Sequence, residues 1–246
     1  MKILGIETSC DETAAAVVED GTRILSNAIV SQIDIFAEYG GVIPEVAARS
    51  HLEVMLPVID KALADASCSW GDIDAIAVTH APGLLGSLLI GTLTARTLAI
   101  LHNKPLYAVH HLKSHVYANW LETNPHHNKP NFPILAIVIS GGHTQILYMP
   151  SHNEFKIIGT TRDDAIGECF DKVAKILGLP YPGGPSIAKV AVDGDANKYH
   201  LPHPKVDGLD FSFSGLKTAV LRAVQKELRL PISHPSHDLK NHLNTQ

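Results

Sequence analysis

Two histidines, His111 and His115, have a type and spacing that indicate metal chemistry. They lie four positions apart in a stretch, residues 111–122, that predicts a helix, so both imidazoles project from one face. That spacing suits a divalent metal ion. The residue after His111 is Leu112, whereas HExxH metallopeptidases have their glutamate base there, so a peptidase is disfavoured. Two histidines also occur at this spacing by chance, and the pair then has no ligand.

The small-residue turn formed by Ser140, Gly141 and Gly142 is a second candidate site. Its glycines let backbone N–H groups converge on an anion, because no Cβ blocks close approach. The apolar run before it, residues 134–139, predicts a strand buried on both faces. The alternative is an ordinary hairpin turn. A second double glycine ends at Gly184, and neither turn is a Walker A loop, since GxxxxGK[ST] does not occur.

Two carboxylates lie near these turns and have alternative interpretations. Asp171 falls on the helix predicted for residues 163–177, where it faces the glycine turn or pairs with Lys175 in solvent. Glu12 stands in the polar turn after the first strand. It is either a turn former or a catalytic carboxylate that faces a cleft.

The elements that must position these residues form a strand–turn–strand unit that occurs twice, about 130 residues apart. A duplicated unit of this kind suggests two similar lobes that face each other across a cleft. After the first unit, a third strand and then alternating helices and strands indicate an α/β lobe of the ribonuclease H type. The helix at residues 44–66 is expected to bury Leu52, Met55, Leu56 and Ile59 on one side.

Composition limits the class of protein. The chain has 246 residues, a formal net charge of −5 and 45% hydrophobic residues, which is typical of a globular protein with one large or two modest domains. The charge gives no general attraction to nucleic acid, so an RNA contact needs a local patch or a partner's surface. Three scattered cysteines without a CxxC pair indicate a reduced, cytoplasmic protein. The longest apolar segment, residues 84–101, contains Arg96 and predicts a buried helix, so no membrane contact is expected.

Five stretches, in order along the chain, closely resemble the TsaD family, once called glycoproteases and now tRNA adenosine threonylcarbamoyltransferases. They are GIETSCDETAAAVV, HHLKSH, VISGGHTQ, GECFDKVAKILGLPYPGGP and LDFSFSGLKTAV, and the resemblance runs from Met1 to about Lys226. It implies a two-lobed, actin-like ATPase fold of ribonuclease H-like lobes. The lobes are expected at residues 1–108 and 109–246, with the second lobe incomplete.

The resemblance also implies an activity, which is transfer of a threonylcarbamoyl group from threonylcarbamoyl-AMP to the N6 amine of the adenosine beside the anticodon. Iron(II) would be bound by His111 and His115 and act as a Lewis acid. ATP or threonylcarbamoyl-AMP is the implied nucleotide, and the implied partners are tRNA, a TsaB-like paralogue and a TsaE-like ATPase. The residues that match the family's substrate contacts are Val138, Ile139, Ser140, Gly141, Gly142, Asp171 and Gly184.

The sequence departs from the family in two ways. Ser114 stands where the family has Gly or Ala, which is a minor change on a helix. Family members also continue for roughly another third, with an AGGVSAN-like nucleotide loop and a late aspartate as third metal ligand, neither of which occurs in these residues. The sequence is therefore expected to be a truncated member with little activity alone. A non-catalytic partner subunit is the alternative, although the family's shorter paralogue lacks the HxxxH pair that this chain keeps.

Overall fold

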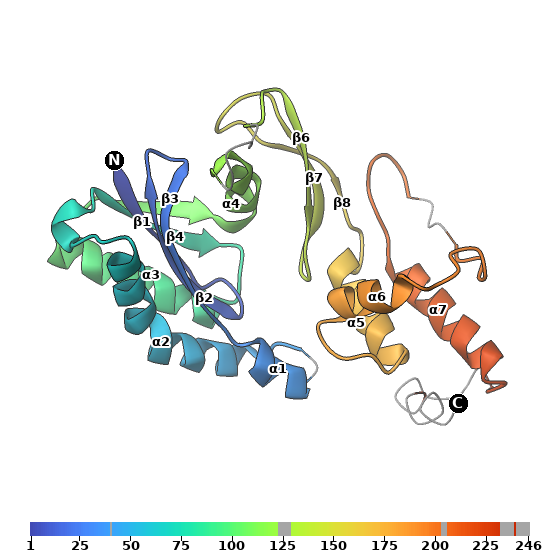
Figure 1. Cartoon of the computed structure of the whole chain (residues 1–246). Coiled ribbons are helices and arrows are strands. Elements are labelled where there is room, and N and C mark those ends of the chain that lie inside the picture. Colours follow the sequence, from blue (N-terminus) through green and yellow to red (C-terminus); the bar gives the residue numbers. More distant parts are fainter. Residues whose placement is uncertain (40, 123–128, 203–205, 232–238, 240–246) are drawn as a thin grey trace. The chain divides into compact units, whose positions relative to one another are not determined.

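The computed structural model describes residues 1–39, 41–122, 129–202, 206–231 and 239. The chain forms two compact units, Met1–Pro130 and Asn131–Gln246, which are coloured blue to green and green to red in Figure 1. The sequence predicts a lobe boundary after residue 108, and that boundary stays a prediction. The helix that carries the two histidines lies within the first unit.

The first unit is built on a five-stranded sheet with the order β3-β2-β1-β4-β5. The first three strands pair antiparallel, and β4 and β5 then continue parallel to β1. This confirms the predicted meander followed by parallel strands, and with it the ribonuclease H-type lobe. The strands are β1 Lys2–Glu7, β2 Glu12–Glu19, β3 Arg23–Ser31, β4 Ala75–Ala81 and β5 Leu106–His110.

Helices pack on this sheet and close one hydrophobic core between α2, α3 and the strands. The predicted apolar stripe of α2 is only partly right. Met55 and Ile59 are buried, but Leu52 and Leu56 are 68% and 58% exposed, and His51 is buried instead. The helices are α1 Ile33–Tyr39, α2 Pro44–Asp65, α3 Leu85–Leu101 and α4 His111–Tyr117, with short 3-10 turns at Trp70–Asp72 and Ala118–Trp120.

The second unit repeats the hairpin in a three-stranded antiparallel sheet with the order β6-β7-β8. Three helices follow, and α5 packs against both α6 and α7. Helix α6 begins with Gly183 and Gly184, and α7 begins with Ser214. The elements are β6 Ile134–Ile139, β7 Thr144–Met149, β8 Lys156–Thr160, α5 Ile166–Ile176, α6 Gly183–Ala191 and α7 Ser214–Glu227.

Strand β6 is not buried on both faces, which corrects the prediction for residues 134–139. Leu135, Ile137 and Ile139 alternate along the strand and are 61%, 59% and 61% exposed. The opposite face carries Val138, which is buried. The strand lies at an edge of its sheet, and among the described residues no strand pairs with its outer side. Apolar composition alone therefore does not establish that both faces are covered.

None of the helices in the described ranges has both the length and the apolar character that crossing a membrane requires.

Buried hydrogen bonds from α2 and α3 fix the turn at residues 8–11, between β1 and β2. His51 on α2 is fully buried, and its Nδ1 lies 2.7 Å from the hydroxyl of Thr13. Its Nε2 lies 2.9 Å from the carbonyl oxygen of Cys10 and must donate, because a carbonyl only accepts. Ser87 on α3 donates to the same carbonyl, and the hydroxyl of Thr8 donates to the carbonyl of Ser87. Two helices thus position one turn.

We expect His51→Ala to destabilise the first unit by about 2–4 kcal/mol. It removes two buried hydrogen bonds and leaves a cavity. The neighbouring Leu52→Ala should change stability by less than about 0.5 kcal/mol, because that side chain is exposed. Urea unfolding followed by tryptophan fluorescence reports this unit, since Trp70 and Trp120 both lie in it. Equal effects of the two substitutions would contradict the buried role of His51.

Candidate functional site

In the first unit, polar side chains gather where three parallel strands end. Glu7 is the last residue of β1, Thr79 lies near the end of β4, and His111 follows β5 directly. Because β1, β4 and β5 are neighbours and parallel, their carboxyl ends share one edge of the sheet. In α/β sheets this edge is where ligands usually bind.

The two predicted metal ligands come together at this edge. Nε2 of His111 lies 3.1 Å from Nε2 of His115, and the two rings meet nearly edge to face. Two nitrogens that each lie about 2.1 Å from one ion, at right or tetrahedral angles, are about 3.0–3.4 Å apart. The spacing therefore fits two imidazoles that share one metal ion. Within the described ranges no group of three or more His, Cys, Asp or Glu residues could hold such an ion.

The other ring nitrogen of His111 faces Glu7 and Ser9. Nδ1 lies 3.2 Å from Oε2 of Glu7 and 3.2 Å from Oγ of Ser9. Burial raises the pKa of the Glu7 carboxyl, but hydrogen bonds from His111, Ser9 and Thr79 outweigh it and lower that pKa to about 2. Glu7 is therefore a carboxylate at neutral pH. A histidine ligand that donates its second ring N–H to a carboxylate is the usual arrangement at metal sites.

The sequence interpretation named Glu12 at this turn and missed Glu7. Glu12 begins β2 with an exposed side chain, and the structure does not join it to the His111 cluster by any hydrogen bond described. Glu7 could have been found from one signal, a carboxylate that ends an apolar strand directly before a polar turn. The catalytic role of Glu12 stays a prediction.

A glycine lets α3 approach the turn that carries Ser9. The backbone N–H of Leu84 donates to the carbonyl oxygen of Ser9 at 2.7 Å. A Cβ on Gly83 would lie 2.5 Å from that same oxygen, so a side chain at this position cannot be accommodated without a shift. Close packing of helix and turn thus requires glycine here.

In the second unit, the predicted anion-binding turn has a defined internal structure. The backbone N–H of Ser140 donates to the carbonyl of His143, and the N–H of His143 donates to Oγ of Ser140. A Cβ at Gly141 or at Gly142 would meet nothing within 4 Å. The turn is therefore closed by its own hydrogen bonds, while its two glycines have open space beside them.

Asp171 does not pair with Lys175, the solvent partner considered from the sequence. Its Oδ1 accepts the backbone N–H of Gly183 at 2.7 Å, at the start of α6. A Cβ on Gly183 would lie 2.5 Å from backbone atoms of Phe170 and Asp171, whereas a Cβ on Gly184 would meet nothing within 4 Å. The first glycine of the pair is thus needed for packing, and only the second, Gly184, has open space beside it.

Helix α5 brings the two double-glycine turns together. Gly167, in its first turn, donates its N–H to the carbonyl of Ser140, and a Cβ there would lie 2.5 Å from that oxygen. Asp171 follows four residues later and therefore lies on the same face of the helix. The first turn of α5 thus contacts the turn at Ser140, and the next turn of the same helix face contacts Gly183 through Asp171.

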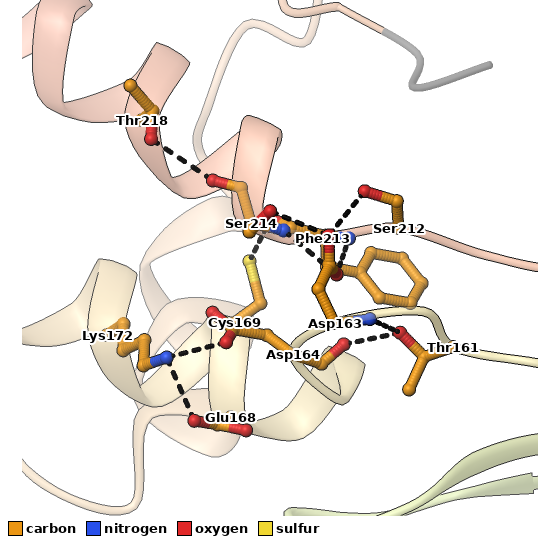
Figure 2. A network of polar contacts seen from close by, with 10 residues as sticks. All are labelled: Thr161, Asp163, Asp164, Glu168, Cys169, Lys172, Ser212, Phe213, Ser214 and Thr218. Atoms are coloured by element: carbon orange, nitrogen blue, oxygen red, sulfur yellow. Dashed lines mark hydrogen bonds and ion pairs between the residues drawn. The ribbon is translucent and has the colours of Figure 1, made fainter. Parts of the chain in front are cut away.

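Helix α7 is fixed to the start of this region by Asp163, as Figure 2 shows. The Asp163 carboxylate accepts hydrogen bonds from the backbone N–H groups of Phe213 and Ser214 and from the hydroxyls of Ser212 and Ser214, at 2.6–3.3 Å. Burial raises the pKa of Asp163, but these hydrogen bonds outweigh it and hold that pKa well below its usual range. Asp163 thus caps the first N–H groups of α7 from a distant part of the sequence.

A second ion cluster lies beside it. Lys172 on α5 contacts Asp164 at 2.7 Å and Glu168 at 2.8 Å, and these hydrogen bonds raise the pKa of Lys172 (Figure 2). Asp171 and Lys172, neighbours on α5, thus both make structural contacts, Asp171 with Gly183 and Lys172 with Asp164 and Glu168.

We expect Gly183→Ala to destabilise the second unit by about 1–3 kcal/mol, because the new Cβ overlaps the backbone of α5. Gly184→Ala should leave stability unchanged within about 0.5 kcal/mol, since the space beside it is open. Differential scanning calorimetry of the two variants measures the difference. A Gly184 variant less stable than the Gly183 variant would reverse this assignment.

We expect Asp163→Asn to destabilise α7 by about 1 kcal/mol at pH 7, the usual magnitude of a lost cap. The folded-state pKa is lowered, so this stabilisation is complete above about pH 4, where free Asp ionises, and declines as pH falls toward the folded-state value. The difference in α7 stability between the Asn variant and the parent chain should therefore become smaller below about pH 4. Hydrogen exchange of the α7 amides measures it, with Asp193→Asn, an exposed carboxylate, as control. A difference that grows as pH falls would contradict the cap.

Comparison with known proteins gives one consistent result. Residues 23–243 match the profile of the family TsaD, tRNA N6-adenosine threonylcarbamoyltransferase. The protein of that name from Symbiobacterium thermophilum is 55% identical over 225 residues, which is 91% of this chain and 65% of the relative. The protein of the same name from Thermomicrobium roseum is 52% identical, with 94% of this chain and 64% of the relative covered. The chain thus spans about two thirds of the length of the curated relatives it matches.

Among solved structures, YeaZ from Pseudomonas aeruginosa is similar over 64% of this chain and 65% of that chain, with 18% sequence identity and a TM-score of 0.40.

Proposed function

This chain belongs to the TsaD family, and we propose that it supplies the metal-binding and nucleotide-binding parts of a tRNA N6-adenosine threonylcarbamoyltransferase. The reaction transfers a threonylcarbamoyl group from threonylcarbamoyl-AMP to the N6 amine of the adenosine beside the anticodon. Both proposed sites lie on elements that the structure describes, one in each unit.

The observation that carries the proposal is the convergence of His111 and His115, with their Nε2 atoms 3.1 Å apart. That arrangement supports a bound metal ion, which we propose to be iron(II). When bound, the ion would act as a Lewis acid on the carbamoyl oxygen or on the phosphate leaving group. The two imidazoles would hold it, and Glu7 and Ser9 contact His111 on its other side.

The nucleotide, ATP or threonylcarbamoyl-AMP, is proposed to bind in the second unit. The open space at Gly141 and Gly142 supports this, because a phosphate can approach backbone N–H groups there without meeting a side chain. Gly184 has the same property on the neighbouring turn. In this proposal Asp171 does not act as a free carboxylate. It accepts the N–H of Gly183, which fixes the start of α6 and therefore the position of Gly184.

The remaining parts of the proposal follow from the family. The tRNA is the proposed acceptor, and a TsaB-like paralogue and a TsaE-like ATPase are the proposed protein partners, in the cytoplasm. The formal charge of −5 supports a partner's contribution to tRNA binding, because this chain has no net positive field of its own. Family membership favours neither a metal peptidase nor a non-catalytic partner subunit.

We expect Gly142→Val to weaken binding of threonylcarbamoyl-AMP or ATP at least about tenfold, which is about 1.4 kcal/mol. The valine side chain occupies space that the ligand needs, while the unliganded fold accommodates it. Isothermal titration calorimetry measures the affinity, and Gly215→Val, the same change at another open glycine, is the control. Unchanged affinity in the Gly142 variant would remove this turn from the site.

We expect slow transfer by the chain alone, below one modified nucleoside per chain. Catalytic metals usually have three protein ligands, and two imidazoles hold an ion more weakly. The assay combines the chain with unmodified tRNA, threonylcarbamoyl-AMP and iron(II), and then quantifies the modified nucleoside by mass spectrometry. His115→Ala should abolish even the residual product. Several turnovers per chain would show that the two histidines suffice, and product formation by the His115 variant would exclude the metal site.

A further inference from the structure

The two ring nitrogens of His111 have different surroundings, and this difference determines which of them carries the proton. Nδ1 faces Oε2 of Glu7 at 3.2 Å and Oγ of Ser9 at 3.2 Å, whereas Nε2 faces Nε2 of His115 at 3.1 Å. A neutral imidazole has one N–H donor and one acceptor. A carboxylate only accepts, so the favoured tautomer has its proton on Nδ1.

Glu7 is itself fixed by the fold. Its Oε1 accepts the backbone N–H of Ser9 at 2.5 Å, at the turn that α3 fixes through Leu84. The Glu7 side chain is 33% exposed and the His111 side chain 23%, so both are largely enclosed. One carboxylate oxygen therefore anchors the turn, and the other faces the imidazole.

We propose that Glu7 is a positioning residue that keeps the His111 proton on Nδ1, so that the Nε2 lone pair is available to a metal ion beside His115. This inference rests on the proposed metal function. The tautomer also accounts for the contact between the histidines without metal, because Nε2 of His111 accepts from the Nε2–H of His115. On metal binding, His115 must then change tautomer, so that its proton moves from Nε2 to Nδ1 and its Nε2 lone pair becomes available as well.

Glu7→Gln is an informative variant because it keeps the shape and removes one acceptor. In the variant the backbone N–H of Ser9 can only donate, so the amide oxygen of the glutamine must face it. Its NH₂ group then faces Nδ1 of His111, which must accept. The proton moves to Nε2, the nitrogen that the metal needs unprotonated.

The first test needs no metal, and the tautomer of the parent chain by itself can already contradict the proposal. Long-range ¹H–¹⁵N spectra of the ¹⁵N-histidine-labelled chain at neutral pH distinguish the two tautomers, and His111→Ala assigns the signal. We expect a protonated Nδ1 in the parent chain and a protonated Nε2 in Glu7→Gln. Glu53→Gln, an exposed site on α2, is the matched control and should leave the signal unchanged. A parent chain with a protonated Nε2, or the same tautomer in Glu7→Gln and the parent, would overturn the proposal.

The second test uses cobalt(II) alone as a spectroscopic probe. We expect Glu7→Gln to weaken cobalt binding about 10–100-fold, the usual effect of losing a partner of a metal-binding histidine, with Glu53→Gln unchanged. Equal cobalt affinity in Glu7→Gln and the parent would overturn the metal part of the inference. If the parent chain does not bind cobalt but the His111 tautomer still changes in Glu7→Gln, the metal function is rejected. The positioning of the His111 proton by Glu7 is then supported on its own.

Discussion

The polar cluster of the first unit depends on how the turn at residues 8–11 is held. The turn lies against two helices, so its backbone groups must find partners inside the protein. His51 and Ser87 donate to the carbonyl of Cys10, and the N–H of Leu84 donates to the carbonyl of Ser9. These bonds fix the backbone at the end of β1, and therefore the positions from which Glu7 and Ser9 contact His111.

A similar packing of a helix start against a turn occurs in the second unit. Gly83 in the first unit and Gly167 in the second each stand where a Cβ would lie 2.5 Å from the carbonyl oxygen of a turn serine, Ser9 or Ser140. A backbone N–H at the start of the following helix donates to that oxygen in each case. The two hairpins thus share their order of strands, and they also share the way in which the start of a helix packs against the turn. A larger residue at either glycine would displace the turn and the groups it presents.

Much of this arrangement could be predicted from the sequence, for reasons that particular residues make clear. Apolar runs bounded by polar turns predicted both hairpins, and the spacing of His111 and His115 predicted their shared helix face. The contact of Glu7 with His111 joins residues 104 positions apart, and no local pattern encodes it. Helix α6 was missed because a double glycine followed by Pro185 has the composition of a turn. The burial of His51 in place of Leu52 was missed because a buried hydrogen-bond network outweighs simple apolar periodicity.

The sheets also differ in a way that affects how the chain behaves in concentrated solution. In the first sheet β1 pairs with β2 on one side and with β4 on the other, whereas β6, which opens the second hairpin, pairs with β7 alone among the described strands. Its outer edge presents a row of backbone donors and acceptors beside the exposed side chains of Leu135, Ile137 and Ile139. Such an edge is a template for any strand of complementary register. Where nothing else covers it, two copies of the chain can join edge to edge, so colloidal stability should decline as protein concentration rises.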